Sequence, residues 1–230
     1  MKPNIEPNTI KISEALGTDS GVITAISMQK KNSKRFSMFV NEVFLIGVSD
    51  NCVQNLNLKK GDVLDQALLD KIFEYEARWK VKNFFIRLLS QRDHASLELK
   101  QKAKIKGYPS ELVDVVIKEL NEKGFINNAE FAKNFAHDKF EFNNWGPQKI
   151  SLELKRKGLN SHAITSAIAH LSNDEISSKM ERLIKKNSAR FYRVDTFKRK
   201  KKIFDFLFRK GYTSDQIMSS MDILLGYFDD

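Results

Sequence analysis

The sequence predicts a mainly α-helical protein in which tandem three-helix repeats form an elongated, curved array behind a small β-rich N-terminal module. Three observations predict this fold. A glycine-centred turn recurs at near-equal spacing, apolar residues around each turn follow helical periodicity, and β-branched and aromatic residues concentrate between Val22 and Leu64. In chain order we expect a loose N-terminal tail (1–20), the β-rich module (21–70) and three helical repeats (71–126, 127–172 and 173–230).

The β-rich module is predicted from short runs of strand-forming residues. Residues 35–40 and 42–48 combine β-branched and aromatic side chains and are expected to be strands. The polar stretch 30–34 predicts a hairpin turn, and the sequence Lys-Lys-Gly-Asp at 59–62 predicts another. After Leu64 the apolar spacing becomes helical and stays so to the C-terminus.

Each helical repeat is built around a Gly-x-x-Ser turn, and the three glycines are spaced by 51 and 53 residues. The glycine supplies the left-handed conformation that ends one helix, and the serine is expected to cap the next. A further helix precedes each pair, over 79–89, 129–140 and 175–184, with Asn128 as the expected cap of the middle one. The repeat-turn residues are Gly107 and Ser110, Gly158 and Ser161, and Gly211 and Ser214.

The charge of the chain is high and unevenly distributed. The net charge is +10 over 230 residues, with −1 in residues 1–76 and +11 in residues 77–230. This imbalance favours an anionic partner, and nucleic acid is the first expectation. The single cysteine, Cys52, excludes an internal disulfide and a cysteine-cluster zinc site, and it fits a reducing compartment.

Nothing in the sequence predicts membrane insertion or export. No apolar run approaches the roughly 20 residues of a membrane helix. The polar start carries Glu6, Glu14 and Asp19, unlike a signal peptide. A cytoplasmic location is therefore expected.

Basic residues near the ends of the repeat helices are the candidate contacts for DNA or an acidic protein. Cations at a helix C-terminus also stabilise the helix dipole, so a capping role is an equal alternative for the shorter runs. The candidates are Lys100, Lys102, Lys104 and Lys106 in repeat 1, Lys155, Arg156 and Lys157 in repeat 2, and Arg193, Lys198, Arg199, Lys200, Lys201, Lys202, Arg209 and Lys210 in repeat 3.

Aromatic residues interleave with the repeat 3 cations, a pattern that suits single-stranded nucleic acid. The alternative is that Phe197, Phe204 and Phe208 belong to the core and the lysines form a solvated face; we favour the core for the phenylalanines. Trp145 precedes a Gly-Pro helix start and is a further contact candidate. It either fills the junction between repeats, which we favour, or anchors a partner.

Catalytic chemistry is not indicated. The four histidines have no metal-binding spacing, and a surface or capping role is expected for each. Nucleotide-binding glycine motifs are absent, so no cofactor is expected. Cys52 has no basic neighbour in sequence and is interpreted as an inert, half-buried thiol.

Several motifs resemble the RecX family, the regulators of the bacterial RecA recombinase. Repeat 1 carries Arg92, Ser96, Glu98-Leu99 and Lys106-Gly107. Repeat 2 carries Gly124-Phe125-Ile126-Asn127-Asn128 with Phe131-Ala132, then Gly146, Ile150, Glu153-Leu154 and Lys157-Gly158. The resemblance covers about residues 22–225. It departs at Asn128, where the family usually has aspartate, at Ala103, where leucine is common, and in repeat 3, the most divergent.

The resemblance implies a regulator without chemistry of its own, acting as a monomer in homologous recombination and the SOS response. Such proteins bind the RecA filament on single-stranded DNA and restrain its assembly, ATPase, strand exchange and co-protease activities; duplex DNA is a further partner to consider. Two alternatives stay open. One is a stand-alone helical-repeat DNA-binding protein, and the other is a nuclease, which would need a carboxylate cluster.

Overall fold

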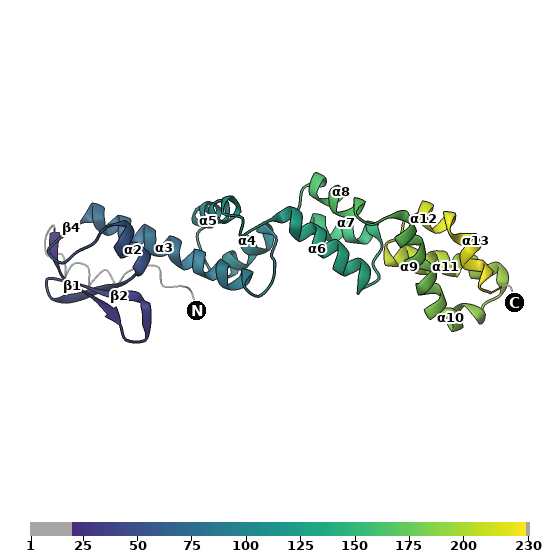
Figure 1. The fold of residues 1–230 in the computed structure, drawn as a ribbon, viewed down its shortest axis with the longest axis horizontal. Coiled ribbons are helices and arrows are strands. Elements are labelled where there is room, and N and C mark those ends of the chain that lie inside the picture. Colours follow the sequence, from purple (N-terminus) through teal and green to yellow (C-terminus); the bar gives the residue numbers. More distant parts are fainter. Residues whose placement is uncertain (1–19, 229–230) are drawn as a thin grey trace. The chain divides into compact units, whose positions relative to one another are not determined.

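The structure, a computed structural model, describes residues 20–228 and is mainly helical with a small N-terminal antiparallel sheet (Figure 1). The expected loose tail lies outside the described residues except for Ser20, which begins the first strand. The chain forms two compact units. The N-terminal unit holds residues 20–92 and 99–123, and the C-terminal unit holds residues 93–98 and 124–228. The five-part division stays a prediction, and each unit is described separately.

The N-terminal unit begins with a sheet of strand order β3-β2-β1-β4, in which neighbouring strands are antiparallel. The strands are β1 (Ser20–Gln29), β2 (Asn32–Val40), β3 (Val43–Ser49) and β4 (Val63–Asp65). The two expected strands are β2 and β3, while β1 and β4 were not predicted. Because β2 begins at Asn32, the first turn is shorter than the expected 30–34. Asn41 and Glu42 make the next turn with positive φ angles of 47° and 68°.

Helices α2 (Asp50–Asn55) and α3 (Gln66–Leu89) pack against the sheet. A helix was expected only from residue 79, but α3 starts directly after β4 because the Asp65 side chain accepts a hydrogen bond from Leu68 N. Glu76 of α3 is buried, accepts from Ser49 N at 2.6 Å and pairs with Arg35 at 3.1 Å. Cys52 is fully buried rather than half-buried.

Helices α4 (Ser96–Ile105) and α5 (Ser110–Glu122) follow, and the turn between them contains Gly107 at φ 79°. Glu119 of α5 joins this region to α3. Its carboxylate accepts from Arg78 at 2.8 Å and Lys82 at 2.6 Å, both on α3, and from Lys123 at 2.8 Å. Burial alone would raise the pKa of Glu119, but these hydrogen bonds from three cations outweigh it and lower the pKa from 4.5 to about 2.

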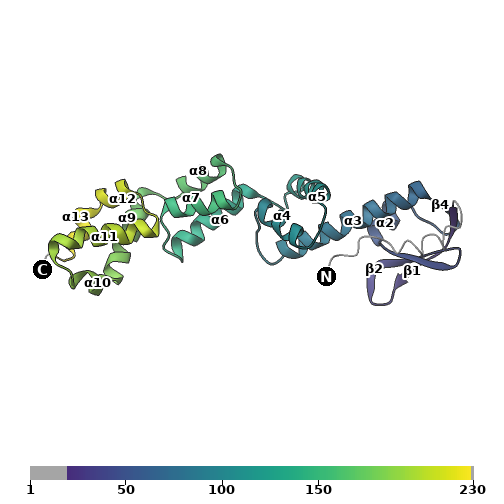
Figure 2. The same ribbon diagram turned by 180° about the vertical axis from the view of Figure 1, so that it is seen from behind.

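The C-terminal unit is entirely helical among its described residues. Helices α6 (Asn128–Glu141), α7 (Pro147–Arg156) and α8 (Ser161–Ala169) lie side by side in both views (Figure 1, Figure 2). They share one apolar core with the helices that follow. These are α9 (Asn173–Lys186), α10 (Ser188–Tyr192), α11 (Thr196–Lys210), α12 (Ser214–Ser219) and α13 (Met221–Gly226).

The repeat turns confirm the left-handed conformation predicted for the glycines, but the predicted N-caps are wrong. Gly158 and Gly211 have φ angles of 79° and 93°, as the helix-ending conformation requires. The serines are not the N-caps: each is the first helical residue, and Pro109, Asn160 and Thr213 precede them as caps. Asn127, not Asn128, caps α6. Asn128 instead binds Ser96, accepting from its backbone N at 3.0 Å.

Repeats 2 and 3 meet at a close backbone contact. Gly146 N donates to Lys210 O at 2.8 Å, and Gln148 N donates to Gly211 O at 3.0 Å. A Cβ atom added at Gly146 would lie 2.3 Å from the carbonyl carbon and oxygen of Gly211. Because Gly146 has an ordinary φ of −77°, closeness and not backbone conformation requires glycine here.

Replacing Glu119 with glutamine should change how stability depends on pH. The folded-state pKa lies below the ordinary value, so the stabilisation is present above about pH 4.5 and is lost as the pH falls towards 2. Urea unfolding from pH 7 to 2 should show this loss in the parent protein and a flatter profile in Glu119→Gln. Glu111→Gln, an exposed change on the same helix, should keep the parent profile. Identical profiles for all three proteins would contradict the assignment.

Gly146→Ala should destabilise the C-terminal unit by about 1–3 kcal/mol, because the added methyl group must displace backbone. Gly226→Ala is the matched control, since no atom lies within 4 Å of its added Cβ. A helical alanine there should be neutral or stabilising by up to about 1 kcal/mol. Thermal or urea unfolding measures both. Equal stability of the two variants would show that the contact is not tight.

Candidate nucleic-acid and partner interface

The repeat 1 lysines extend along and beyond the end of α4. Lys100 is exposed and pairs with Asp114 at 2.7 Å. Lys102 is half-buried, while Lys104 and Lys106 are exposed. Only Lys100 among the four has a carboxylate within ion-pair distance in residues 20–228. The other three therefore keep charge that a partner could meet.

Lys157 is engaged inside the C-terminal unit. Its ammonium pairs with Glu98 and lies 5.3 Å from the centre of the Phe135 ring and 5.8 Å from that of Phe131. The pair joins the end of α7 to the start of α4, which belongs to the same unit. Lys157 thus has a structural role that its place in a basic run did not indicate.

Arg199 is also internal, at 8% exposed. Its guanidinium donates to the carbonyl oxygens of Phe191, Val194 and Phe228 at 3.3–3.4 Å and lies 5.0 Å from the Phe228 ring centre. The contact role predicted for Arg199 therefore does not fit the structure. Its spacing with Ile203 and Leu207 on the buried face of α11 is the signal that would have shown this.

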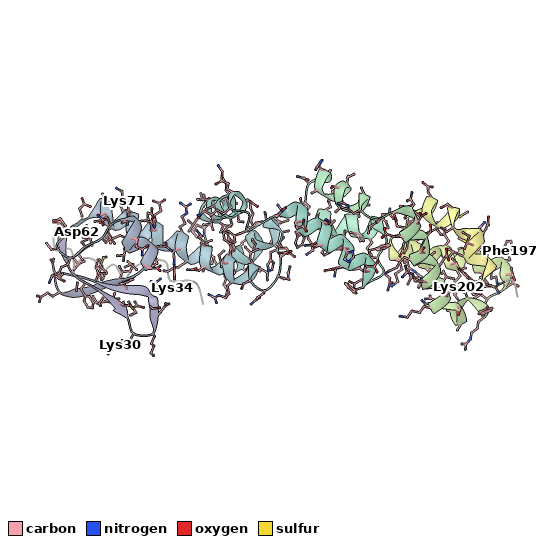
Figure 3. All side chains as sticks on the ribbon, viewed as in Figure 1. Lys30, Lys34, Asp62, Lys71, Phe197 and Lys202 are labelled. Atoms are coloured by element: carbon pink, nitrogen blue, oxygen red, sulfur yellow. The ribbon has the colours of Figure 1, made fainter. Side chains whose placement is uncertain are left out.

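The exposed part of the repeat 3 run lies where α10 meets α11. We call it the α10–α11 surface and define it as Tyr192, Arg193, Phe197, Lys198 and Lys201. Phe197 is 92% exposed, so its predicted place in the core was wrong; Figure 3 labels it beside Lys202 on the C-terminal unit. All three cations of the surface are exposed, and none has a carboxylate within ion-pair distance among the described residues.

The remaining repeat 3 candidates differ in exposure. Lys200 is exposed, whereas Lys202 is half-buried and donates to Arg190 O at 3.1 Å. Lys210 is half-buried, and its carbonyl receives the Gly146 hydrogen bond at the repeat junction.

A groove of about 680 Å³ runs between α7, α8 and the end of α11 in the C-terminal unit. It brings together the predicted residues Lys155, Arg156 and Arg209. It also contains Lys149, Leu152 and Phe208, which the sequence analysis missed as site residues. Lys149, Leu152 and Arg156 are spaced i, i+3, i+7, which places them on one helix face and is the signal that could have found them. We call this the α7–α8–α11 groove.

Trp145 directly precedes Gly146, the glycine at the repeat junction. It is half-buried against the core, and its N donates to Lys139 O at 3.0 Å. The ring centre lies 4.4 Å from the ammonium of Lys149 and 5.3 Å from that of Lys139. Half-burial disfavours a fully exposed anchor, and the junction role stays a prediction. Phe142, in the same loop, is exposed instead.

The titratable side chains do not form a metal-binding cluster in the described range. Between residues 20 and 228 no three His, Cys, Asp or Glu side chains are grouped to hold a metal ion. Burial raises the pKa of Cys52 to about 12, with Glu76 raising it further and Arg35 partly opposing. His94 is buried, with Nδ1 3.4 Å from Glu98, which corrects its expected surface or capping role; the other histidines are exposed.

None of the helices between residues 20 and 228 has both the length and the apolar character needed to cross a membrane.

Three family models match the chain. They are the regulatory protein RecX N-terminal domain over residues 21–65, the RecX second three-helix domain over 127–168 and the RecX third three-helix domain over 175–221. The first covers the sheet through β4. The other two begin close to the starts of α6 and α9 and so correspond to repeats 2 and 3.

Regulatory proteins RecX from other bacteria are similar to this chain over most of its length. A regulatory protein RecX of Clostridioides difficile (strain 630) is 29% identical over 207 residues, which are 90% of this chain and 97% of that protein. The regulatory protein RecX of Bacillus subtilis (strain 168) is 31% identical over 207 residues, 87% of this chain and 76% of that protein.

Solved structures share the fold. A crystal structure of regulatory protein RecX has a TM-score of 0.79 at 21% identity, covering 88% of this chain and 99% of that chain. RecX from Lactobacillus salivarius has a TM-score of 0.60 at 20% identity, covering 66% and 97%. On the family models and the sequence identity of these relatives, this chain belongs to the RecX family of regulatory proteins.

Proposed function

We propose that this protein binds the RecA filament on single-stranded DNA and restrains its ATPase, recombinase and co-protease activities in DNA repair. It would do so as a cytoplasmic monomer without chemistry of its own. Membership of a regulatory family makes this the leading function. The observation that carries the DNA contact is the α10–α11 surface, where an almost fully exposed phenylalanine stands among exposed cations.

Apolar exposure and charge both support DNA binding at this surface. Phe197 exposes nearly its whole ring to water, so covering the ring with a partner would be favourable. A base can stack on the ring while Lys198 and Lys201 meet the neighbouring phosphates. This combination suits a single strand, since the bases of a duplex are already stacked.

The alternative function, a stand-alone DNA-binding protein, shares this surface but predicts different behaviour. It requires tight binding to naked duplex without any recombinase, and sequence preference through contacts to base edges. The filament function requires instead that the protein act on the recombinase at ratios well below one per recombinase subunit.

The deciding experiment is the single-stranded-DNA-dependent ATPase of the matching RecA, titrated with this protein at two salt concentrations. A fall in activity at substoichiometric ratios supports docking on the filament. An unchanged ATPase at excess protein, together with tight binding to naked duplex, would reject the filament function and favour the alternative.

Substitutions in the α10–α11 surface should weaken single-strand binding in two separable ways. Phe197→Ala removes a stacking platform and should cost about 1–3 kcal/mol of binding free energy. Lys201→Glu removes one phosphate contact and should lower the log–log salt dependence by about 0.7. Fluorescence anisotropy with labelled oligo(dT) at several salt concentrations measures both effects.

The control for these changes is Lys30→Glu with Lys34→Glu, exposed lysines of the β1–β2 hairpin labelled in Figure 3. This pair should leave single-strand affinity near the parent value. Equal weakening by the control would show that net charge, and not this surface, governs binding.

Arg199→Gln should behave differently from its exposed neighbours. Removing the guanidinium breaks its hydrogen bonds to three carbonyl oxygens, two of them buried, so the C-terminal unit should lose about 2–4 kcal/mol of stability. Lys200→Gln, one residue on and exposed, should leave the unfolding midpoint within experimental error. Urea unfolding of the two variants makes the comparison; a stable Arg199→Gln would mean that the arginine is not structural.

A further inference from the structure

The α7–α8–α11 groove is lined by both apolar and cationic side chains. We call the apolar ones its floor: Leu152 of α7, Ile164 of α8 and Phe208 of α11. Leu152 is 50% exposed and Phe208 is 47% exposed, so both present apolar surface to water. We call the charged ones its rim: Lys149, Lys155, Arg156 and Arg209, with one carboxylate, Glu153.

The charge of the rim is mostly uncompensated. Glu153 is occupied by Arg156, whose Nη1 lies 2.6 Å from it. Lys155 and Arg209 are exposed and, within residues 20–228, have no carboxylate at ion-pair distance; Lys149 instead lies over the Trp145 ring. An occupant of the groove should therefore be negatively charged overall.

The apolar floor favours an acidic protein segment over a nucleic acid. The Phe208 ring is stacked on Phe204, with ring centres 5.7 Å apart and 12° between planes. One side of the ring is thus already in contact with another ring of the same helix. Leu152 and Ile164 are aliphatic and offer no stacking surface for a base. An aliphatic or aromatic amino-acid side chain, which gains from burial without needing a stacked geometry, fits this floor better.

Polar groups in the groove favour the same occupant. Ser151, Ser161 and Thr165 line it together with Glu153. Glu153 can accept hydrogen bonds from backbone N–H groups, which a peptide has. The sugar–phosphate backbone of DNA has no such donors. The groove volume, about 680 Å³, lies in the range of about 300–1,000 Å³ typical of ligand sites.

We propose that the α7–α8–α11 groove binds an acidic protein segment with apolar anchor side chains, and that it is not part of the single-strand track. The carboxylates of the segment would meet Lys155 and Arg209, while its anchor would cover Leu152 and Phe208. This inference rests on the proposed function, in which the partner contains protein as well as DNA, and it assigns the protein contact to the groove.

The test is binding of a labelled peptide, Asp-Glu-Leu-Phe-Glu-Asp, to the full chain by fluorescence anisotropy. We expect saturable binding. Affinity should fall about tenfold when serines replace the Leu-Phe anchor, because burial of the apolar side chains is lost. Leu152→Ser and Arg209→Glu should each lower the affinity for the parent peptide by about the same factor. Lys155→Glu is a second rim variant in case Leu152→Ser fails to fold, as judged by thermal melting.

Matched controls come from the same unit. Phe197→Ala and Lys201→Glu remove an exposed aromatic and an exposed cation outside the groove, and should keep the peptide affinity of the parent. Excess unlabelled oligo(dT) should not displace the peptide.

Three results would overturn the inference: no saturable peptide binding, equal loss of peptide affinity in the groove and control variants, or displacement of the peptide by oligo(dT). The last would identify the groove as part of a nucleic-acid track. Because the peptide assay contains no recombinase, its failure is distinguishable from failure of the proposed function, which the ATPase titration reports.

Discussion

The arrangement of the C-terminal unit depends on close approach at its repeat turns. Gly158 lies against the Leu97 side chain, and Gly211 lies against Lys149 and the backbone of Gly146. A side chain at either position would both strain the left-handed backbone and collide with the preceding repeat. The turn therefore has two roles. It ends one helix, and its glycine lets the start of a helix from the preceding repeat pack closely against it.

This contact also positions residues of the α7–α8–α11 groove. Hydrogen bonds from Gly146 N and Gln148 N hold the start of α7 against the end of α11, where Arg209 and Phe208 lie. The groove is thus the outer side of a repeat junction, and its cations belong to two repeats. At the neighbouring junction Lys157, which precedes its turn glycine as Lys210 does, pairs with Glu98. The lysine before the turn glycine is therefore partly buried at both junctions.

The sequence predicted the helical repeats well because they depend on local features. Glycine conformation and 3.6-residue periodicity are properties of short segments, and both glycine turns of the C-terminal unit adopt the expected φ. The caps were displaced by one residue since Asn160 and Thr213 are as competent as the serines after them. Strand β4 was missed because it is three residues long and pairs with β1, which is distant in sequence.

The site was predicted less completely, for a physical reason. A basic run indicates charge but not which face of the helix carries it. Arg199 and Lys201 stand in one run, yet the first is buried and the second exposed. Phe197 was assigned to the core from its type alone, although it lies on the same face of α11 as Lys201 and opposite Arg199. Helix-face assignment, applied to the charged residues as well as the apolar ones, would have separated these roles.

Helix α11 carries both proposed contacts on one face. Phe197, Lys201 and Phe208 follow i, i+4, i+11 spacing, so they lie along the outer side of the helix. At 1.5 Å per residue, Phe197 and Phe208 are about 16 Å apart. That separation leaves room for a nucleic-acid strand at the start of the helix and a protein segment at its end. A filament of recombinase on single-stranded DNA presents both chemistries together, whereas naked DNA presents only one. Simultaneous use of both ends would let the protein distinguish the filament from either component alone.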